Sequence, residues 1–264
     1  MKSSNPINQI YFHRKILWRI ARSDLGARYA GSVLGVGWAI ISPLLILTIY
    51  SLVYLVIFRV RVPNLTSAEY VLFVFSGLVP YLMTAEAISS GVISVVANKD
   101  LLSNTVFPIA LAPVKSILIA QMPAVVGFTG ILIAIAITGN FSWTVIFLPL
   151  IWVLNIIALI GLLWILAPVN VVFRDIQNVI SSILMILMIG SPIAYTPDMI
   201  PSSLKIIITL NPFAYFVVSY QRILIYGLPP TFADLIAMVM IALILIIAGS
   251  FFFSVTIKGF VDHV

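Results

Sequence analysis

Long apolar stretches separated by short polar segments dominate the chain. A helix that crosses a bilayer needs about 20 apolar residues at 1.5 Å each. Charged residues and a turn signal at Thr138-Gly139-Asn140-Phe141-Ser142 divide the sequence into six such stretches. We predict membrane spans over 33–58, 70–94, 111–138, 144–168, 176–196 and 233–257. The pattern therefore predicts an all-α integral membrane protein in which residues 1–264 form a single transmembrane domain.

Composition supports this interpretation and excludes several classes of protein. Apolar and aromatic residues make up 62% of the chain and charged residues only 8%, whereas a soluble domain has about 25% charged residues. So few charges could not cover a soluble enzyme or keep a disordered chain in water. Cysteine is absent, and the two histidines, His13 and His263, lie near the ends. We therefore expect no metal site.

Basic residues in the short segments between spans predict the orientation. With the N-terminus inside, ten basic residues lie on the cytoplasmic side and four outside. The cytoplasmic ones are Lys2, Arg14, Lys15, Arg19, Arg22, Arg28, Lys99, Lys115, Arg174 and Lys258. The outer ones are Arg59, Arg61, Lys205 and Arg222. Together with an even number of spans, this bias predicts that both termini are cytoplasmic.

Residues 8–29 have the pattern of an amphipathic helix at the membrane surface. Leu17, Ala21 and Leu25 share one side with Trp18 beside them, and a separate basic stripe contains Lys15, Arg19 and Arg22, with Arg28 at its end. This helix has two explanations. It is either a positive-inside anchor alone, or a surface that also attracts the phosphate groups of a lipid carrier.

The outer segment 197–231 is rich in proline. Its apolar stretch, Ile206 to Tyr220, is too short to cross a bilayer and is cut by Asn211-Pro212. We expect two short external helices that enter the membrane and return, which requires burial in protein or a wet cavity. The segment is either an external gate or a structural cap, and the candidate gate residues are Asn211, Pro212, Phe213 and Tyr215.

The inner segment 95–108 is too polar for the membrane and too apolar for a free loop. A short helix near Asn98 that exposes Leu101 and Leu102 would suit docking against another protein, although a helix lying on its own bundle fits equally well. The candidate docking residues here are Asn98, Lys99, Leu101, Leu102 and Phe107. Arg174-Asp175 forms a second, smaller inner segment.

Two features inside the predicted spans have candidate roles. Glu86 is an acidic residue located well inside the second predicted span. Lys115 is a basic residue at a comparable depth in the third, so we expect the two side chains to pair. A role of Glu86 in a substrate path is the alternative. Tyr50, Tyr54 and Phe58 form a stripe at helical spacing, which favours packing but also suits weak stacking on sugar rings.

The sequence contains no Gly-x-x-x-x-Gly-Lys-Ser/Thr phosphate loop, so any nucleotide energy must come from a partner. Its acidic residues are scattered, which disfavours a membrane glycosyltransferase. A stand-alone secondary transporter is the other rival, but such transporters usually contain several carboxylates within their spans.

Three stretches together resemble the type-2 ABC exporter permeases of the polysaccharide branch, closest to the Wzm-type O-antigen exporters, with capsule and teichoic acid exporters as near neighbours. The first runs from Arg28-Tyr29 through Ser32-Val33-Leu34-Gly35-Val36-Gly37-Trp38 to Pro43-Leu44. The second is Asn98, Leu101 and Phe107-Pro108. The third comprises Asn170-Val171-Val172-Phe173-Arg174-Asp175, Ser191-Pro192-Ile193-Ala194-Tyr195 and Leu210-Asn211-Pro212-Phe213.

This resemblance implies a homodimer of six-span subunits in the bacterial cytoplasmic membrane. Two copies of a separate ATPase, which bind ATP and Mg²⁺, would drive export of a glycan linked to polyprenyl pyrophosphate. The chain itself would be neither an enzyme nor a holder of cofactors, and it would contact membrane lipids but no nucleic acid. Segment 95–108 would be the coupling helix that contacts the ATPase. Export of capsule or teichoic acid is the alternative within this family.

Overall fold

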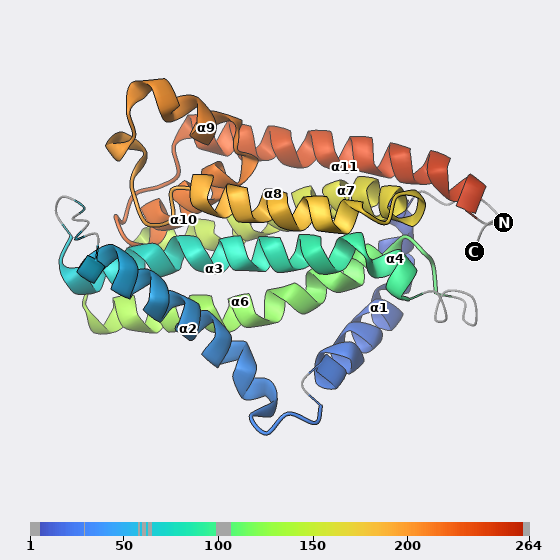
Figure 1. Ribbon diagram of the computed structural model, residues 1–264, viewed down its shortest axis with the longest axis horizontal. Helices are drawn as coiled ribbons and strands as arrows, with labels where there is room; N and C mark the ends of the chain where they lie inside the picture. The colour runs from blue at the N-terminus through green and yellow to red at the C-terminus, as the bar shows by residue number, and fades with distance from the viewer. Residues whose placement is uncertain are drawn as a thin grey trace.

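The computed structural model of the chain describes residues 6–28, 30–57, 59, 62, 65–98 and 107–260. Over these residues the secondary structure is helical, without strands (Figure 1). The principal helices are α1 (Pro6–Arg28), α2 (Trp38–Ser51), α3 (Ser67–Val92), α4 (Ser94–Ala97), α6 (Leu111–Ile137), α7 (Leu148–Val172), α8 (Ile176–Gly190), α9 (Lys205–Leu210), α10 (Pro212–Leu224) and α11 (Phe232–Phe260). Single turns occur at η1 (Gly35–Gly37), η3 (Trp143–Phe147), η4 (Pro197–Met199) and η5 (Ser202–Leu204), and the π-helix η2 (Leu52–Ile57) extends α2.

The helical content confirms the predicted all-α membrane fold. Among the described residues, five helical segments are long and apolar enough to cross a bilayer. They are Ile40–Ile57, Ser67–Val92, Leu111–Ile137, Trp143–Val172 and Phe232–Thr256. A sixth crossing is possible only if the bent pair Ser202–Leu210 and Pro212–Leu224 counts as one span.

The stretch predicted as a span over 176–196 forms a shorter helix. Helix α8 has 15 residues and ends at Gly190. Ser191 then adopts an extended conformation, because a residue before proline avoids helical backbone angles and Pro192 offers no amide hydrogen to the helix. The remaining residues of the predicted span form an irregular segment.

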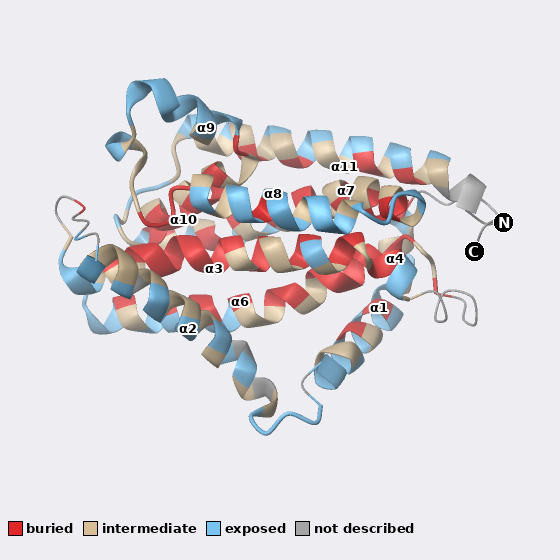
Figure 2. Ribbon diagram, viewed as in Figure 1, coloured by how far each residue is buried: buried red, intermediate tan, exposed pale blue. Residues whose placement is uncertain are grey.

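Helix α3 is the centre of the bundle. It is buried along most of its length, whereas α2 and α8 are largely exposed (Figure 2). Its first turn is fixed by a capping box, in which the Thr66 hydroxyl accepts from the Glu69 amide and the Glu69 carboxylate accepts from the Thr66 amide. It packs against α2, α6, α7, α8 and α10, so most of the other long helices contact it.

Helices α7 and α11 cross at two glycines. A Cβ on Gly249 would collide with the backbone carbonyl of Gly161, and a Cβ on Gly161 would collide with the backbone of Leu245. Small residues at such a crossing allow the two backbones to touch, which is how helices commonly associate in lipid.

Helix α1 packs against protein with its apolar side. Leu17 and Ala21 are buried, and Leu17 lies in a cluster with Leu111, Trp164 and Phe253 from α6, α7 and α11. The basic stripe of Lys15, Arg19 and Arg22 is exposed, as its spacing predicts. The location of this helix at a membrane surface stays a prediction.

Candidate functional site

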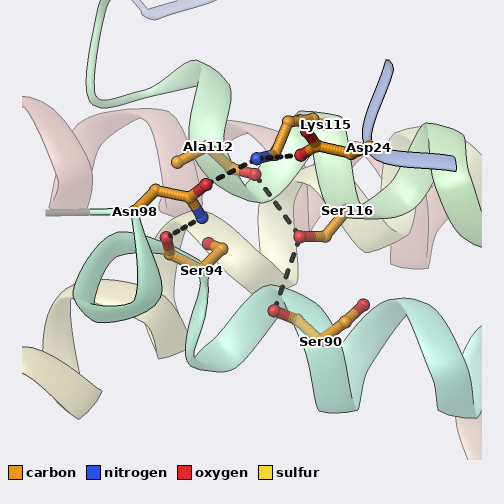
Figure 3. Close-up of polar contacts among 7 residues, drawn as sticks. All are labelled: Asp24, Ser90, Ser94, Asn98, Ala112, Lys115 and Ser116. Carbon is orange, nitrogen blue, oxygen red and sulfur yellow. Dashed lines mark hydrogen bonds and ion pairs between the residues drawn. The ribbon is translucent and has the colours of Figure 1, made fainter. Parts of the chain in front are cut away.

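A buried lysine ties three segments together at one end of the bundle. Lys115 of α6 is only 4% exposed. Its Nζ lies 2.5 Å from Asp24 Oδ2 of α1 and donates to Asn98 Oδ1 over 2.6 Å. Asn98 in turn donates to the Ser94 carbonyl, as Figure 3 shows. The charge of Lys115 is therefore compensated, and α1 and α6 are connected to Asn98 within the predicted docking segment 95–108.

The structure contradicts the predicted pair between Glu86 and Lys115. Glu86 instead lies 2.8 Å from Arg28 at the end of α1, with both side chains about 40% exposed (38% and 41%). Counting residues from the ends of two spans does not specify which way a side chain points around its helix. The end of α1 supplies a partner to each charge, Asp24 to Lys115 and Arg28 to Glu86.

The described parts of the predicted docking segment lie beside this lysine. Phe107 is buried in the cluster that contains Leu17 of α1 and Leu111 of α6. Asn98 accepts a hydrogen bond from Lys115. Lys99, Leu101 and Leu102 lie outside the described residues. Arg174 and Asp175 are exposed in the turn between α7 and α8, at the same end of the bundle as α4 (Figure 1).

A cavity of about 340 Å³ opens between α2, α3 and α6, next to the Arg28–Glu86 pair. Its lining is Arg28, Trp38, Ser42, Pro43, Ile46, Val79, Leu82, Met83, Ala85, Glu86, Ser89, Ala120, Pro123 and Ala124. This volume falls within the range of small-molecule pockets.

At the opposite end of the bundle, the helical stretch is interrupted at Asn211-Pro212, as predicted. Helices α9 and α10 meet at Asn211 with a bend of 98°. The Asn211 side chain caps α10 by accepting from the Phe213 amide over 3.0 Å, and it donates to Ser191 Oγ over 2.8 Å. Pro212 occupies the first turn of α10, and Tyr215 donates to the Thr209 carbonyl. Helix α9 is exposed, whereas α10 is mostly buried.

Two further residues, neither of them predicted from the sequence, hold the irregular segment after α8. Gln221 of α10 is 2% exposed and donates to the carbonyls of Pro192 and Ile193. Tyr70 of α3 donates to the Ala194 carbonyl over 2.7 Å. A polar amide in an apolar helix was the available signal for Gln221, because buried polar groups need partners. These bonds fix the segment to the bundle core.

The tyrosine stripe of α2 is partly buried. The rings of Tyr50 and Tyr54 stack with centroids 5.8 Å apart, and both pack against a cluster that contains Tyr70 and Tyr81. Phe58 lies outside the described residues. The stacking supports packing as one role of the stripe.

Comparisons with known proteins identify the family. The family described as ABC-2 type transporter matches residues 15–225. An O-antigen export system permease protein RfbA of Myxococcus xanthus is 26% identical over 261 residues, which cover 98% of both chains. Two proteins of the same name from Klebsiella pneumoniae are 31% and 30% identical over 214 residues, 79% of each chain. These matches and the apolar helices confirm the resemblance noted in the sequence: the chain is a multi-pass membrane protein that belongs to the ABC-2 type transporter family.

Proposed function

We propose that this chain is the transmembrane subunit of an ATP-driven exporter that moves a lipid-linked, O-antigen-like polysaccharide across the bacterial cytoplasmic membrane. The similarity to the Myxococcus xanthus O-antigen export permease supports this most strongly, because it covers 98% of both chains. The family match over residues 15–225 supports the same function. The chain is a transporter subunit rather than an enzyme, and ATP and Mg²⁺ bind to a separate ATPase.

In this proposal the working unit is a homodimer that carries two copies of the ATPase, with both termini of each subunit in the cytoplasm. Segment 95–108 forms the main ATPase contact, and Arg174-Asp175 forms a smaller one. The position of Asn98 supports this assignment, because its side chain is bonded to Lys115 and thereby to Asp24 of α1. A force on the segment would therefore reach α1 and α6 directly.

The glycan path is proposed to offer many weak contacts, because a long polymer must slide rather than bind tightly. Tyr50 and Tyr54 are partly exposed near the outer part of the bundle and suit stacking on sugar rings. The exposed stripe of Lys15, Arg19 and Arg22 suits the diphosphate of the polyprenyl carrier. Arg28 already pairs with Glu86, which separates it from that stripe. Around Asn211, the bent α9–α10 pair is proposed to gate the exit.

Co-expression with the ATPase tests the partner assignment. The two chains should purify together, and replacing Leu101 and Leu102 with Asp should uncouple ATP hydrolysis from export while the bundle stays folded. Leu228→Asp is a matched control, because Leu228 is an exposed leucine in the loop after α10. If the double variant assembles with the ATPase and exports normally, the coupling assignment is wrong. Substrate movement driven by a proton gradient without nucleotide would refute the exporter itself.

A further inference from the structure

We propose that the cavity between α2, α3 and α6 binds one zwitterionic phospholipid with a primary amine, such as phosphatidylethanolamine. The Arg28–Glu86 pair holds its headgroup, and the apolar part of the cavity receives the start of an acyl chain. This site is separate from the proposed polysaccharide path.

The lining changes from polar to apolar along the helix axes. Ser89 and Glu86, which pairs with Arg28, lie in the last two turns of α3. Val79 precedes Glu86 by two turns of α3, so it lies roughly 10 Å deeper in the bundle. A phospholipid has the same order of polar and apolar parts, with a charged headgroup at the interface and an apolar tail toward the middle of the bilayer.

The charges select the kind of headgroup. Arg28 and Glu86 lie 2.8 Å apart and together form a site without net charge. The guanidinium binds phosphate oxygens, and the carboxylate accepts hydrogen bonds from an ammonium group. A zwitterionic ethanolamine headgroup satisfies both side chains.

Other amphiphiles fit this arrangement less well. A diphosphate has more negative charge than the single phosphate of a phospholipid, and this additional charge would be repelled by the nearby Glu86 carboxylate. Choline has no N–H to donate to Glu86. The glycerol headgroup can donate a hydroxyl hydrogen to Glu86 but has no positive charge to pair with the carboxylate, whereas the ethanolamine ammonium supplies both. Both side chains are about 40% exposed (41% and 38%), which leaves room for a ligand to approach them.

Native mass spectrometry of the purified full-length chain tests this inference. Phosphatidylethanolamine, phosphatidylcholine and phosphatidylglycerol with identical acyl chains would be offered in equal amounts. Wild-type protein should retain phosphatidylethanolamine over phosphatidylcholine by about tenfold, which is what one charge-assisted hydrogen bond provides. Glu86→Gln should remove this preference, and Arg28→Gln should weaken retention of all three lipids.

Two further variants separate the cavity from general lipid attraction. Arg19→Gln removes an exposed arginine of the same helix that does not line the cavity and should leave the preference unchanged. Ser42→Leu adds volume at an exposed position of the lining and should lower retention of every lipid. Equal retention of the amine and choline lipids, or preference for phosphatidylglycerol, would overturn the proposal.

A competition experiment distinguishes this site from the substrate path. Undecaprenyl diphosphate should not displace phosphatidylethanolamine from the wild-type chain. If it does, and Ser42→Leu abolishes its binding, the cavity belongs to the substrate carrier and our assignment is wrong. Because the measurement needs neither the ATPase nor transport, its failure would leave the proposed export function untouched.

Discussion

The buried lysine predicts an asymmetry between two substitutions. The Lys115 side chain is 5% exposed and that of Asp24 is 40% exposed. Asp24→Ala leaves a buried ammonium with Asn98 as its described partner, whereas Lys115→Met leaves a carboxylate that water can reach. The first substitution should therefore destabilise the protein more than the second, although both remove the same ion pair.

The magnitudes follow from this difference in burial. Removing one partner of a buried pair costs about 3–5 kcal/mol, and the partial exposure of Asp24 places Asp24→Ala near 3 kcal/mol on that scale. Lys115→Met removes the buried positive charge itself, so it should lower the free energy of unfolding by only about 1 kcal/mol. With about 2–4 °C per kcal/mol for a chain of this size, the expected losses in Tm are roughly 6–12 °C and 2–4 °C.

Thermal unfolding of the detergent-purified chain, followed by the loss of the monodisperse chromatographic peak, measures both values. The double variant should resemble Lys115→Met alone, because Asp24 has no buried charge left to compensate. Asp175→Ala, which removes an exposed acid at the same end, should change stability by less than about 0.5 kcal/mol. Equal losses for the two single variants, or a larger loss for Lys115→Met, would refute the charge argument.

The remaining predictions concern other parts of the bundle. Glu86→Ala should change the free energy of unfolding by less than about 1 kcal/mol, because its ion pair with Arg28 is partly exposed; a larger loss in a melting curve would contradict this. Gly249→Ala should cost at least about 2 kcal/mol or prevent folding, because the added methyl group meets the α7 backbone; normal stability would show that the crossing is looser. Gln221→Leu should release the segment after α8 and increase its cleavage by added protease; an unchanged rate would refute its fixing role. Reversing Arg19 and Arg22 to Glu should lower export more than membrane insertion; an equal loss of both would leave only an anchoring role.

The parts of the fold that depend on local chemistry were predictable from the sequence. Apolar length predicted the long helices, and the fixed backbone of Pro212 and the capping side chain of Asn211 predicted the break between α9 and α10. The same logic applied to Pro192 would have predicted the end of α8 at Gly190, but the apolar run through residue 196 concealed it.

The ion pairs were not predictable in this way. Position along a span predicted comparable depths for Glu86 and Lys115, but pairing also depends on rotation around each helix and on other segments of the chain that pack nearby. Both charges find partners on α1, more than 50 residues earlier in the chain. Asp24 is four residues before Arg28, so one helical turn presents both partners to α3 and α6.

Transport in inside-out membrane vesicles tests the central claim most directly. Vesicles that contain the chain, its ATPase and a polyprenyl-diphosphate-linked glycan would receive ATP, and protection of the glycan from an added glycosidase would be followed over time. We predict that protection requires the chain, the ATPase and hydrolysable ATP together, and that it fails when Leu101 and Leu102 are replaced with Asp. Protection that develops without ATP, or an absence of protection when all components are present, would contradict the account.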